Sequence, residues 1–308
     1  MHPTRPLAAA LAAALAAAVL AVGAGAGAKS GPIVLRDDTG ATVTLKAPAR
    51  RIVSLISSDT QIALALGLRR RLVGVDLDSI EYMAPPYDRL VKGLPSIGDT
   101  YPTPSLERIV KARPDLILSS TAVAGAAKLK ALGIPVLTLN PQNLAGIEHD
   151  IVLVGEATGE TAAAQRLVAH LRASTAHLER VVRAAGAHPS VYVEIGQNPY
   201  YTVGPGSYID SLLHLLGAVN VIDRTAKVAY PEVSSEQVVA LDPQVIVLDE
   251  PGVTPRQVAS RPGWQVVAAV KSHRVYDNVN MNALSEPGPA VLTALWQLAR
   301  DLYPKTAG

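Results

Sequence analysis

Short, continuously apolar runs alternate with segments of helical periodicity over residues 51–140. The apolar runs lie at residues 51–57, 71–76, 115–120 and 134–140. Between them, DTQIALALG and AAKLKALG repeat apolar residues every three or four positions and end at a glycine. Apolar runs of this length indicate strands covered on both faces, and strands that alternate with helices predict a parallel sheet. Before them, residues 33–46 predict a hairpin around DDTG.

The same alternation resumes in the second half of the chain. Further apolar runs and helical patterns follow at residues 191–196, 207–217, 244–249, 273–278 and 289–303. Between the two halves, residues 160–185 contain neither glycine nor proline and predict one helix, roughly 39 Å long at 1.5 Å per residue. The sequence therefore predicts an α/β protein with lobes at residues 29–145 and 189–308, joined by a linker and long helix at residues 146–188.

One sequence unit occurs twice, as SLERIVKARPDLIL at residues 105–118 and SSEQVVALDPQVIV at residues 234–247. The shared positions are Ser105 and Ser234, Glu107 and Glu236, and Pro114 and Pro243. An offset of 129 residues (236 − 107) is too long for a solenoid repeat. We therefore expect one copy at the same place in each lobe. Each glutamate would lie in the first turn of a helix, where the helix dipole favours a negative charge even without a partner.

Composition and charge exclude several classes of protein. The net charge is +2, from 28 basic and 26 acidic side chains, and no basic run is interleaved with aromatic residues, so nucleic acid is not an expected partner. Cysteine is absent, which leaves no thiolate metal site, disulfide, thiol nucleophile or cysteine for a lipid anchor. No pair of histidines has the spacing of a closed metal site, so no metal site is expected, and His214 is interpreted as a half-buried helix residue.

The first 28 residues have the features of a secretory signal peptide. A weakly basic start with His2 and Arg5 precedes an apolar stretch at residues 7–22 and an A-x-A site at residues 26–28. An uncleaved membrane anchor is the alternative, because the apolar stretch is close to the length of a membrane-spanning helix. With cleavage, the mature protein begins near Lys29 and is expected in the periplasm.

Enzyme signatures are missing from the sequence. There is no G-x-S-x-G motif, and serine, histidine and aspartate do not follow apolar runs in the order of a catalytic triad. We therefore expect a protein that is not an enzyme, with a secreted hydrolase as the remote alternative.

Several motifs together resemble a known family. In order along the chain they are RIVSLISSDTQIALALG, LERIVKARPDLIL, IGQNPYYTVGPGSYI, YPEVSSEQVVALDPQVIVL and LSEPGP. The chain after Arg50 resembles the periplasmic binding proteins that deliver cobalamin, haem and ferric siderophores to ATP-driven importers, and it is most similar to the cobalamin-binding members. The resemblance implies two Rossmann-like lobes with mainly parallel sheets, one long connecting helix and a ligand cleft between the lobes. It also implies a monomer whose partners are an ABC permease and its ATPase, with Glu107 and Glu236 docking into arginine pockets of the permease.

Tyrosines cluster in the loops that follow the predicted strands. They are Tyr82, Tyr87, Tyr101, Tyr200, Tyr201 and Tyr230. Ligands of open parallel sheets bind beyond the carboxyl ends of the strands, so we expect these side chains to line the ligand site. Tyrosine offers an apolar ring face and a polar tip, which suits a large planar or corrinoid ligand.

The family resemblance adds detail to this predicted site. Tyr101 and Tyr230 occupy positions where cobalamin-binding members carry tryptophans, and Asn198 lies in NPYYT, which matches their Asn-Pro-aromatic loop. Haem-binding members coordinate iron through a tyrosine of the loop that holds Tyr101, and siderophore binders use cleft arginines, for which Arg224 is the candidate. No covalent cofactor is expected. A corrinoid is the favoured ligand, and an iron chelate, either a ferric siderophore or haem, is the alternative.

Overall fold

The computed structural model describes residues 31–101 and 103–306. The predicted signal peptide and its alternative as a membrane anchor lie outside these residues. All helices and strands described below belong to one compact unit, Ile33–Gly308. Within the described residues, no helix combines the length and the apolar character needed to cross a membrane.

The N-lobe is built on a parallel five-stranded sheet with the strand order β5-β4-β3-β6-β7. Its strands are β3 (Ile52–Ser54), β4 (Leu72–Asp76), β5 (Ser96–Gly98), β6 (Leu116–Ser119) and β7 (Val136–Thr138). Its helices are α1 (Ser57–Ala65), the 3-10 helix η1 (Leu68–Arg71), α2 (Leu77–Glu81), α3 (Leu106–Ala112) and α4 (Ala126–Ala131). The predicted hairpin is confirmed as antiparallel strands β1 (Ile33–Arg36) and β2 (Thr42–Leu45).

The C-lobe has a mixed sheet with the order β11-β9-β8-β12-β13, and β10 pairs with β8. Its strands are β8 (Ser190–Gly196), β9 (Tyr200–Thr202), β10 (Val219–Asn220), β11 (Glu232–Val233), β12 (Val245–Leu248) and β13 (Val275–Tyr276). Its helical segments are α7 (Tyr208–Leu215), η2 (Val221–Arg224), α8 (Ser235–Leu241), α9 (Pro255–Ala259), η3 (Trp264–Val266), α10 (Ala268–Lys271) and α11 (Met281–Ser285). Strand β9 pairs antiparallel with β8 on one side and with β11 on the other. The NPYYT segment therefore forms a hairpin with β8, which the sequence did not predict.

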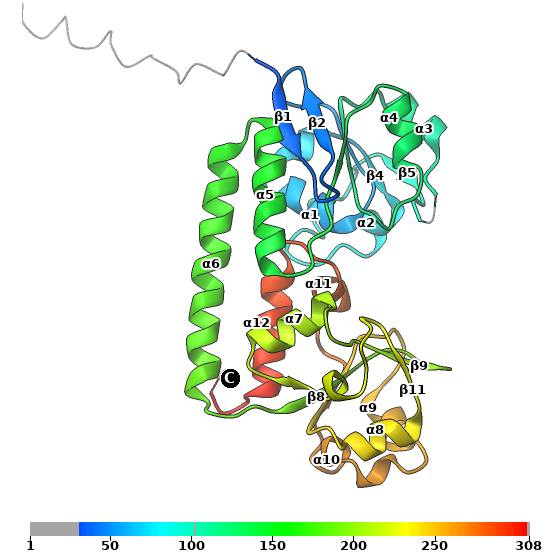
Figure 1. The fold of residues 1–308 in the computed structure, drawn as a ribbon, viewed down its shortest axis with the longest axis vertical. Coiled ribbons are helices and arrows are strands. Elements are labelled where there is room, and N and C mark those ends of the chain that lie inside the picture. The colour runs from blue at the N-terminus through cyan, green and yellow to red at the C-terminus, as the bar shows by residue number, and fades with distance from the viewer. Residues whose placement is uncertain (1–30, 102, 307–308) are drawn as a thin grey trace, which may run out of the picture. The chain divides into compact units, whose positions relative to one another are not determined.

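The predicted long helix is confirmed as α6 (Thr161–Ala184), which contacts α5 (Leu144–Thr158) and α12 (Val291–Leu302) (Figure 1). The predicted linker before it is therefore largely helical. The buried residues of α6 recur every three or four positions and form one face, as Ala164, Val168, Leu171, Thr175, Leu178 and Val182. A Cβ added at Gly155 would lie 2.5 Å from the Cβ of Ala164, so glycine permits the close contact between α5 and α6.

A single hydrophobic cluster connects the two lobes. It includes Leu116 and Leu118 of β6, passes through α5, α6 and α12, and reaches Val191 and Val193 of β8. Two further clusters lie within single lobes, one around Ile109 and Ile117 in the N-lobe and one around Tyr192 and Trp264 in the C-lobe. Because burial of apolar surface is the main stabilising contribution, the shared cluster couples the stability of the lobes.

One carboxylic acid lies inside this shared core. Asp150 of α5 is fully buried, and neither of its carboxyl oxygens has a hydrogen-bond partner among the described residues. Burial, together with the nearby carboxylates of Asp38 and Asp59, raises the pKa of Asp150 to about 9. The folded protein therefore holds this group in its neutral, protonated form at pH 7.

We expect Asp150→Asn to change how stability depends on pH. A folded-state pKa above the unfolded value contributes stability that is complete below the unfolded pKa and is lost as pH rises towards the folded pKa. Between the two pKa values, such a group lowers the free energy of unfolding by up to about 1.4 kcal/mol per pH unit. As the pH rises from 5 to 8, the unchanged protein should therefore lose about 2–4 kcal/mol more of its free energy of unfolding than Asp150→Asn does, because asparagine does not titrate.

Urea denaturation at both pH values measures this difference. Asp277→Asn, at an exposed position, is the control and should follow the unchanged protein at both pH values. Parallel pH profiles for the unchanged protein and Asp150→Asn would contradict a buried neutral acid at position 150.

Candidate ligand site and docking helices

The repeated sequence unit forms the same local structure in both lobes. Helices α3 and α8 each have seven residues, and their bounds differ by 129 positions (235 − 106 and 241 − 112). The hydroxyl of Ser105 accepts a hydrogen bond from the Arg108 N–H at 3.4 Å, and that of Ser234 accepts one from the Gln237 N–H at 3.2 Å. Each helix ends at a left-handed residue, followed by a proline and a strand, β6 or β12. The predicted structural duplication is confirmed.

Glu107 and Glu236 occupy the same position in these two helices. Both side chains are exposed in the first helical turn. Hydrogen bonding from its own backbone N–H and from the Ser234 hydroxyl lowers the pKa of Glu236, which keeps this carboxylate charged. Within residues 31–101 and 103–306, neither glutamate forms an ion pair with a basic side chain. Each copy of the unit therefore presents one unpaired negative charge to the solvent.

Four of the six predicted tyrosines are strongly exposed. The exposed fractions are 56% for Tyr82, 73% for Tyr101, 42% for Tyr201 and 57% for Tyr230. In the N-lobe, Tyr82 directly follows α2, and Tyr101 follows β5. In the C-lobe, Tyr201 lies in β9 opposite Glu232 of β11, and Tyr230 lies two residues before β11. Each lobe thus carries two tyrosines with solvent-exposed side chains.

The other two predicted tyrosines pack into the protein. Tyr87 is half-buried against the shared core, and burial raises its pKa to about 12. Tyr200 lies with its ring centroid 5.8 Å from that of Trp264, and the guanidinium carbon of Arg261 lies 4.8 Å from the Tyr200 ring centroid. Successive side chains of a strand point to opposite faces, which explains why Tyr200 is packed while Tyr201 is exposed.

Asn198 and Arg224 have different surroundings from each other. Asn198 is exposed and adopts a left-handed backbone with φ of 64° in the turn between β8 and β9, a conformation that asparagine tolerates better than most residues. Arg224 lines a cavity of about 320 Å³ with His188, Ser190 and Gln244, which lie where β8 and β12 begin. None of the predicted tyrosines lines this cavity.

Direct polar contacts between the lobes were not predicted from the sequence. The side-chain amide of Gln61 in α1 donates to Glu286 Oε2 at 2.7 Å, and its Oε1 accepts from the Ala290 N–H at 3.1 Å. Burial raises the pKa of Glu286 to about 8. A Cβ at Gly288 would lie 2.5 Å from Gln61 Oε1, so the glycine of LSEPGP is needed for this approach. The LSEPGP motif was the available signal, but its partner lies 225 residues away in sequence.

The amide of Asn282 in α11 also crosses between the lobes. It donates a hydrogen bond to the backbone carbonyl of Tyr82. This contact holds the backbone of an exposed N-lobe tyrosine against the C-lobe. The backbone at Tyr82 is thus in direct contact with the C-lobe.

The protein has two α/β lobes that share a core and are joined by a long helix. Each lobe presents one exposed glutamate on its copy of the duplicated helix. These features define a two-lobed binding protein. The chain belongs to the periplasmic binding protein family, whose sequence profile matches residues 52–278. It is a substrate-binding protein of an ABC-type importer, and this membership places it outside the cytoplasm. The family and the fold predicted from sequence are both confirmed.

Three similar proteins illustrate the family. An uncharacterised ABC transporter substrate-binding lipoprotein of Bacillus subtilis is 32% identical, with 89% of this chain and 87% of that protein covered. The crystal structure of the periplasmic vitamin B12 binding protein of Vibrio cholerae is 27% identical, with a TM-score of 0.68, covering 83% of this chain and 97% of that one. The apo structure of a periplasmic haem-binding protein of Roseiflexus is 26% identical, with a TM-score of 0.72 and coverages of 84% and 100%.

Proposed function

We propose that the protein binds a corrinoid such as cobalamin between its lobes and delivers it to an ABC permease. The observation that carries this proposal is the set of four exposed tyrosines, two from each lobe. Large aromatic side chains are the residues that dominate binding when a partner covers them. A ligand that covers these four rings would bury apolar surface that the protein leaves exposed.

The chemistry of the quartet fits a corrinoid. A corrin ring presents a broad apolar face that can pack on tyrosine rings, and its amide side chains can pair with tyrosine hydroxyls. The similarity to the vitamin B12 binding protein of Vibrio cholerae supports this ligand class. No bond is made or broken in this function, and the specificity rests on a small number of loop side chains.

Haem is the second candidate. Tyr101 has the most exposed of the four rings, and a tyrosine phenolate is a known axial ligand of haem iron. The similarity to the haem-binding protein of Roseiflexus is consistent with this alternative. A ferric siderophore has less support, because the arginine expected to meet an anionic chelate, Arg224, lines a cavity on the amino side of the C-lobe sheet.

Delivery to the permease is proposed to use Glu107 and Glu236, which would pair with arginines of the membrane partner. We further propose that residues 1–28 are removed as a signal peptide and that the mature protein works as a monomer in the periplasm. The ATPase that drives the permease would complete the importer.

The ligand assignment is tested by calorimetric titration of the protein with cyanocobalamin, haemin and ferric siderophores. We expect cyanocobalamin to bind, and we expect Tyr101→Ala and Tyr230→Ala each to weaken binding at least about tenfold through loss of ring contact. Leu132→Ala removes a side chain of similar exposure (56%) at the end of α4 and serves as the control. Selective binding of haemin or of a siderophore would reject the corrinoid, and equal losses in the control would reject the tyrosine site.

A further inference from the structure

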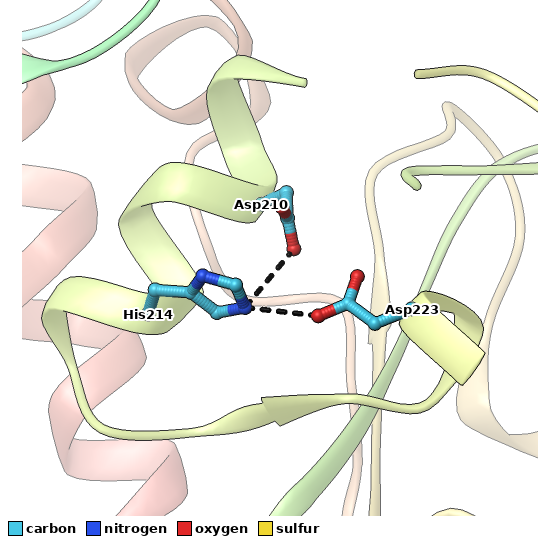
Figure 2. Close-up of side chains that lie close together, drawn as sticks. All are labelled: Asp210, His214 and Asp223. Carbon is cyan, nitrogen blue, oxygen red and sulfur yellow. Dashed lines mark hydrogen bonds and ion pairs between the residues drawn. The ribbon is translucent and has the colours of Figure 1, made fainter. Parts of the chain in front are cut away.

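We propose that Asp210, His214 and Asp223 of the C-lobe form a binding site for one divalent transition-metal ion, with Zn²⁺ as the best fit. The three side chains converge from two separate elements (Figure 2). Asp210 and His214 are four residues apart on one face of α7, and Asp223 comes from η2. The site is separate from the ligand site proposed above, because none of the exposed tyrosines belongs to it.

The distances within the cluster match the size of a metal site. His214 Nε2 lies 2.9 Å from Asp223 Oδ2 and 3.6 Å from Asp210 Oδ1. One ligand atom from each of the three residues lies within 4.8 Å of the other two. Nitrogen and oxygen ligands bind zinc at about 2.0–2.2 Å, so the ligand atoms of a tetrahedral ion are roughly 3.3–3.6 Å apart. Small side-chain movements would therefore suffice to admit the ion.

Asn220 holds both carboxylates in position. Its Nδ2 donates to Asp210 Oδ1 at 2.9 Å, while its Oδ1 accepts from the Ile222 N–H at 3.1 Å and so caps the helix that carries Asp223. The second oxygen of Asp210 accepts from the Gly206 N–H at 3.3 Å. Asn220 and Asp210 are both buried. Hydrogen bonds of this kind orient metal ligands in known sites, and here they exist before any ion binds.

The cluster contains more negative charge than its histidine can neutralise. A proton on His214 Nε2 can be donated to Asp223 Oδ2, 2.9 Å away. The distance from His214 Nε2 to Asp210 Oδ1, 3.6 Å, is too long for a hydrogen bond. The other oxygen of Asp223, Oδ1, is buried and has no hydrogen-bond partner among the described residues. A divalent ion would neutralise both carboxylates and could engage the unpartnered oxygen.

The donor set selects the class of metal. One imidazole with two carboxylates suits Zn²⁺ and similar ions, whereas Ca²⁺ and Mg²⁺ prefer oxygen ligands alone. The His214 side chain is 55% exposed and lines a cavity of about 380 Å³, so water can reach the site and complete the coordination. The ion would join α7 to η2 and stabilise the C-lobe.

The sequence predicts no metal site, because no two histidines have the spacing of metal ligands. This cluster has one histidine, and its third ligand lies nine residues further along the chain, after a strand and a turn. Only the fold brings the three side chains together.

Calorimetric titration of the chelator-treated full chain with Zn²⁺ alone tests the proposal. We expect one ion per chain and a higher melting temperature with Zn²⁺, because the ion binds the folded state. His214→Gln and Asp223→Asn should each weaken Zn²⁺ binding at least about tenfold. His170→Gln, at an exposed position of α6, is the control and should bind Zn²⁺ as the unchanged protein does.

A Co²⁺ titration gives a second measurement that does not depend on stability. Binding at the cluster should produce a visible absorption band that both variants lose and the control keeps. The proposal is overturned if the unchanged chain binds no Zn²⁺, or if both variants bind it as tightly as the control does. Either result would leave the cluster as a histidine–carboxylate ion pair.

Discussion

Simultaneous Glu107→Arg and Glu236→Arg substitutions are expected to abolish delivery of the ligand to the importer while leaving ligand affinity unchanged. The two carboxylates lie at equivalent positions of duplicated helices and have no basic partner within the described residues. If each meets an arginine of the permease, reversal replaces two attractions by two repulsions. Binding of the loaded protein to the permease should then weaken at least about a hundredfold.

The measurement is ATP-driven uptake of labelled ligand into proteoliposomes that contain the cognate permease and ATPase. Glu156→Arg with Asp277→Arg is the matched control, because it reverses two exposed charges outside α3 and α8 and changes the net charge equally. Uptake should fail with the docking double variant and persist with the control. Normal uptake with Glu107 and Glu236 reversed would remove both residues from the docking interface.

The second large effect concerns stability, and it is expected for Arg261→Met. The guanidinium of Arg261 donates to both carboxyl oxygens of Glu194, at 2.7 and 2.6 Å, and the Glu194 side chain is fully buried in β8. The same guanidinium lies 4.8 Å from the Tyr200 ring centroid and 4.6 Å from that of Trp264. Methionine would fill much of the volume but leave a buried carboxylate without a counter-charge. The expected loss is about 3–5 kcal/mol in the free energy of unfolding.

Urea denaturation of the single and double variants separates charge from packing. Adding Glu194→Gln to Arg261→Met removes the unpaired charge and should recover a large part of the lost stability. Glu194→Gln alone leaves Arg261 access to Gln197 and to the aromatic rings, so it should cost less than Arg261→Met. A loss below about 1 kcal/mol for Arg261→Met would show that this pair contributes no more than a surface ion pair.

Much of the architecture could be predicted from local sequence patterns. The apolar runs at residues 71–76 and 115–120 became β4 and β6, and the stretch free of glycine and proline became α6. These elements follow from periodicity because burial of one face or of both faces imposes a residue spacing that is visible along the chain. The short strands β9 and β11 were not predicted, since two or three residues are too few to show any period.

The candidate site was predicted less completely than the fold. Sequence identified the tyrosine-rich loops, but only packing separates the exposed ring of Tyr201 from the packed ring of Tyr200. Arg224 was the candidate cleft arginine because of the resemblance to siderophore-binding members, and the cavity that it lines also contains residues just before β8 and β12. The contact between Gln61 and Glu286 could not be predicted from the LSEPGP motif, because the partner residue lies 225 residues away in the other lobe.

What the sequence determined by itself was the class of the protein, its two-lobed α/β plan and the duplicated helix that carries Glu107 and Glu236. Each of these depends on neighbouring residues, whose spacing the backbone geometry of helices and strands imposes. The tertiary structure alone decided which tyrosines remain uncovered, how the lobes join through Gln61, and that Asp223 meets His214. Those features depend on side chains that are distant in sequence and are brought into contact by packing, so no local sequence pattern predicts them.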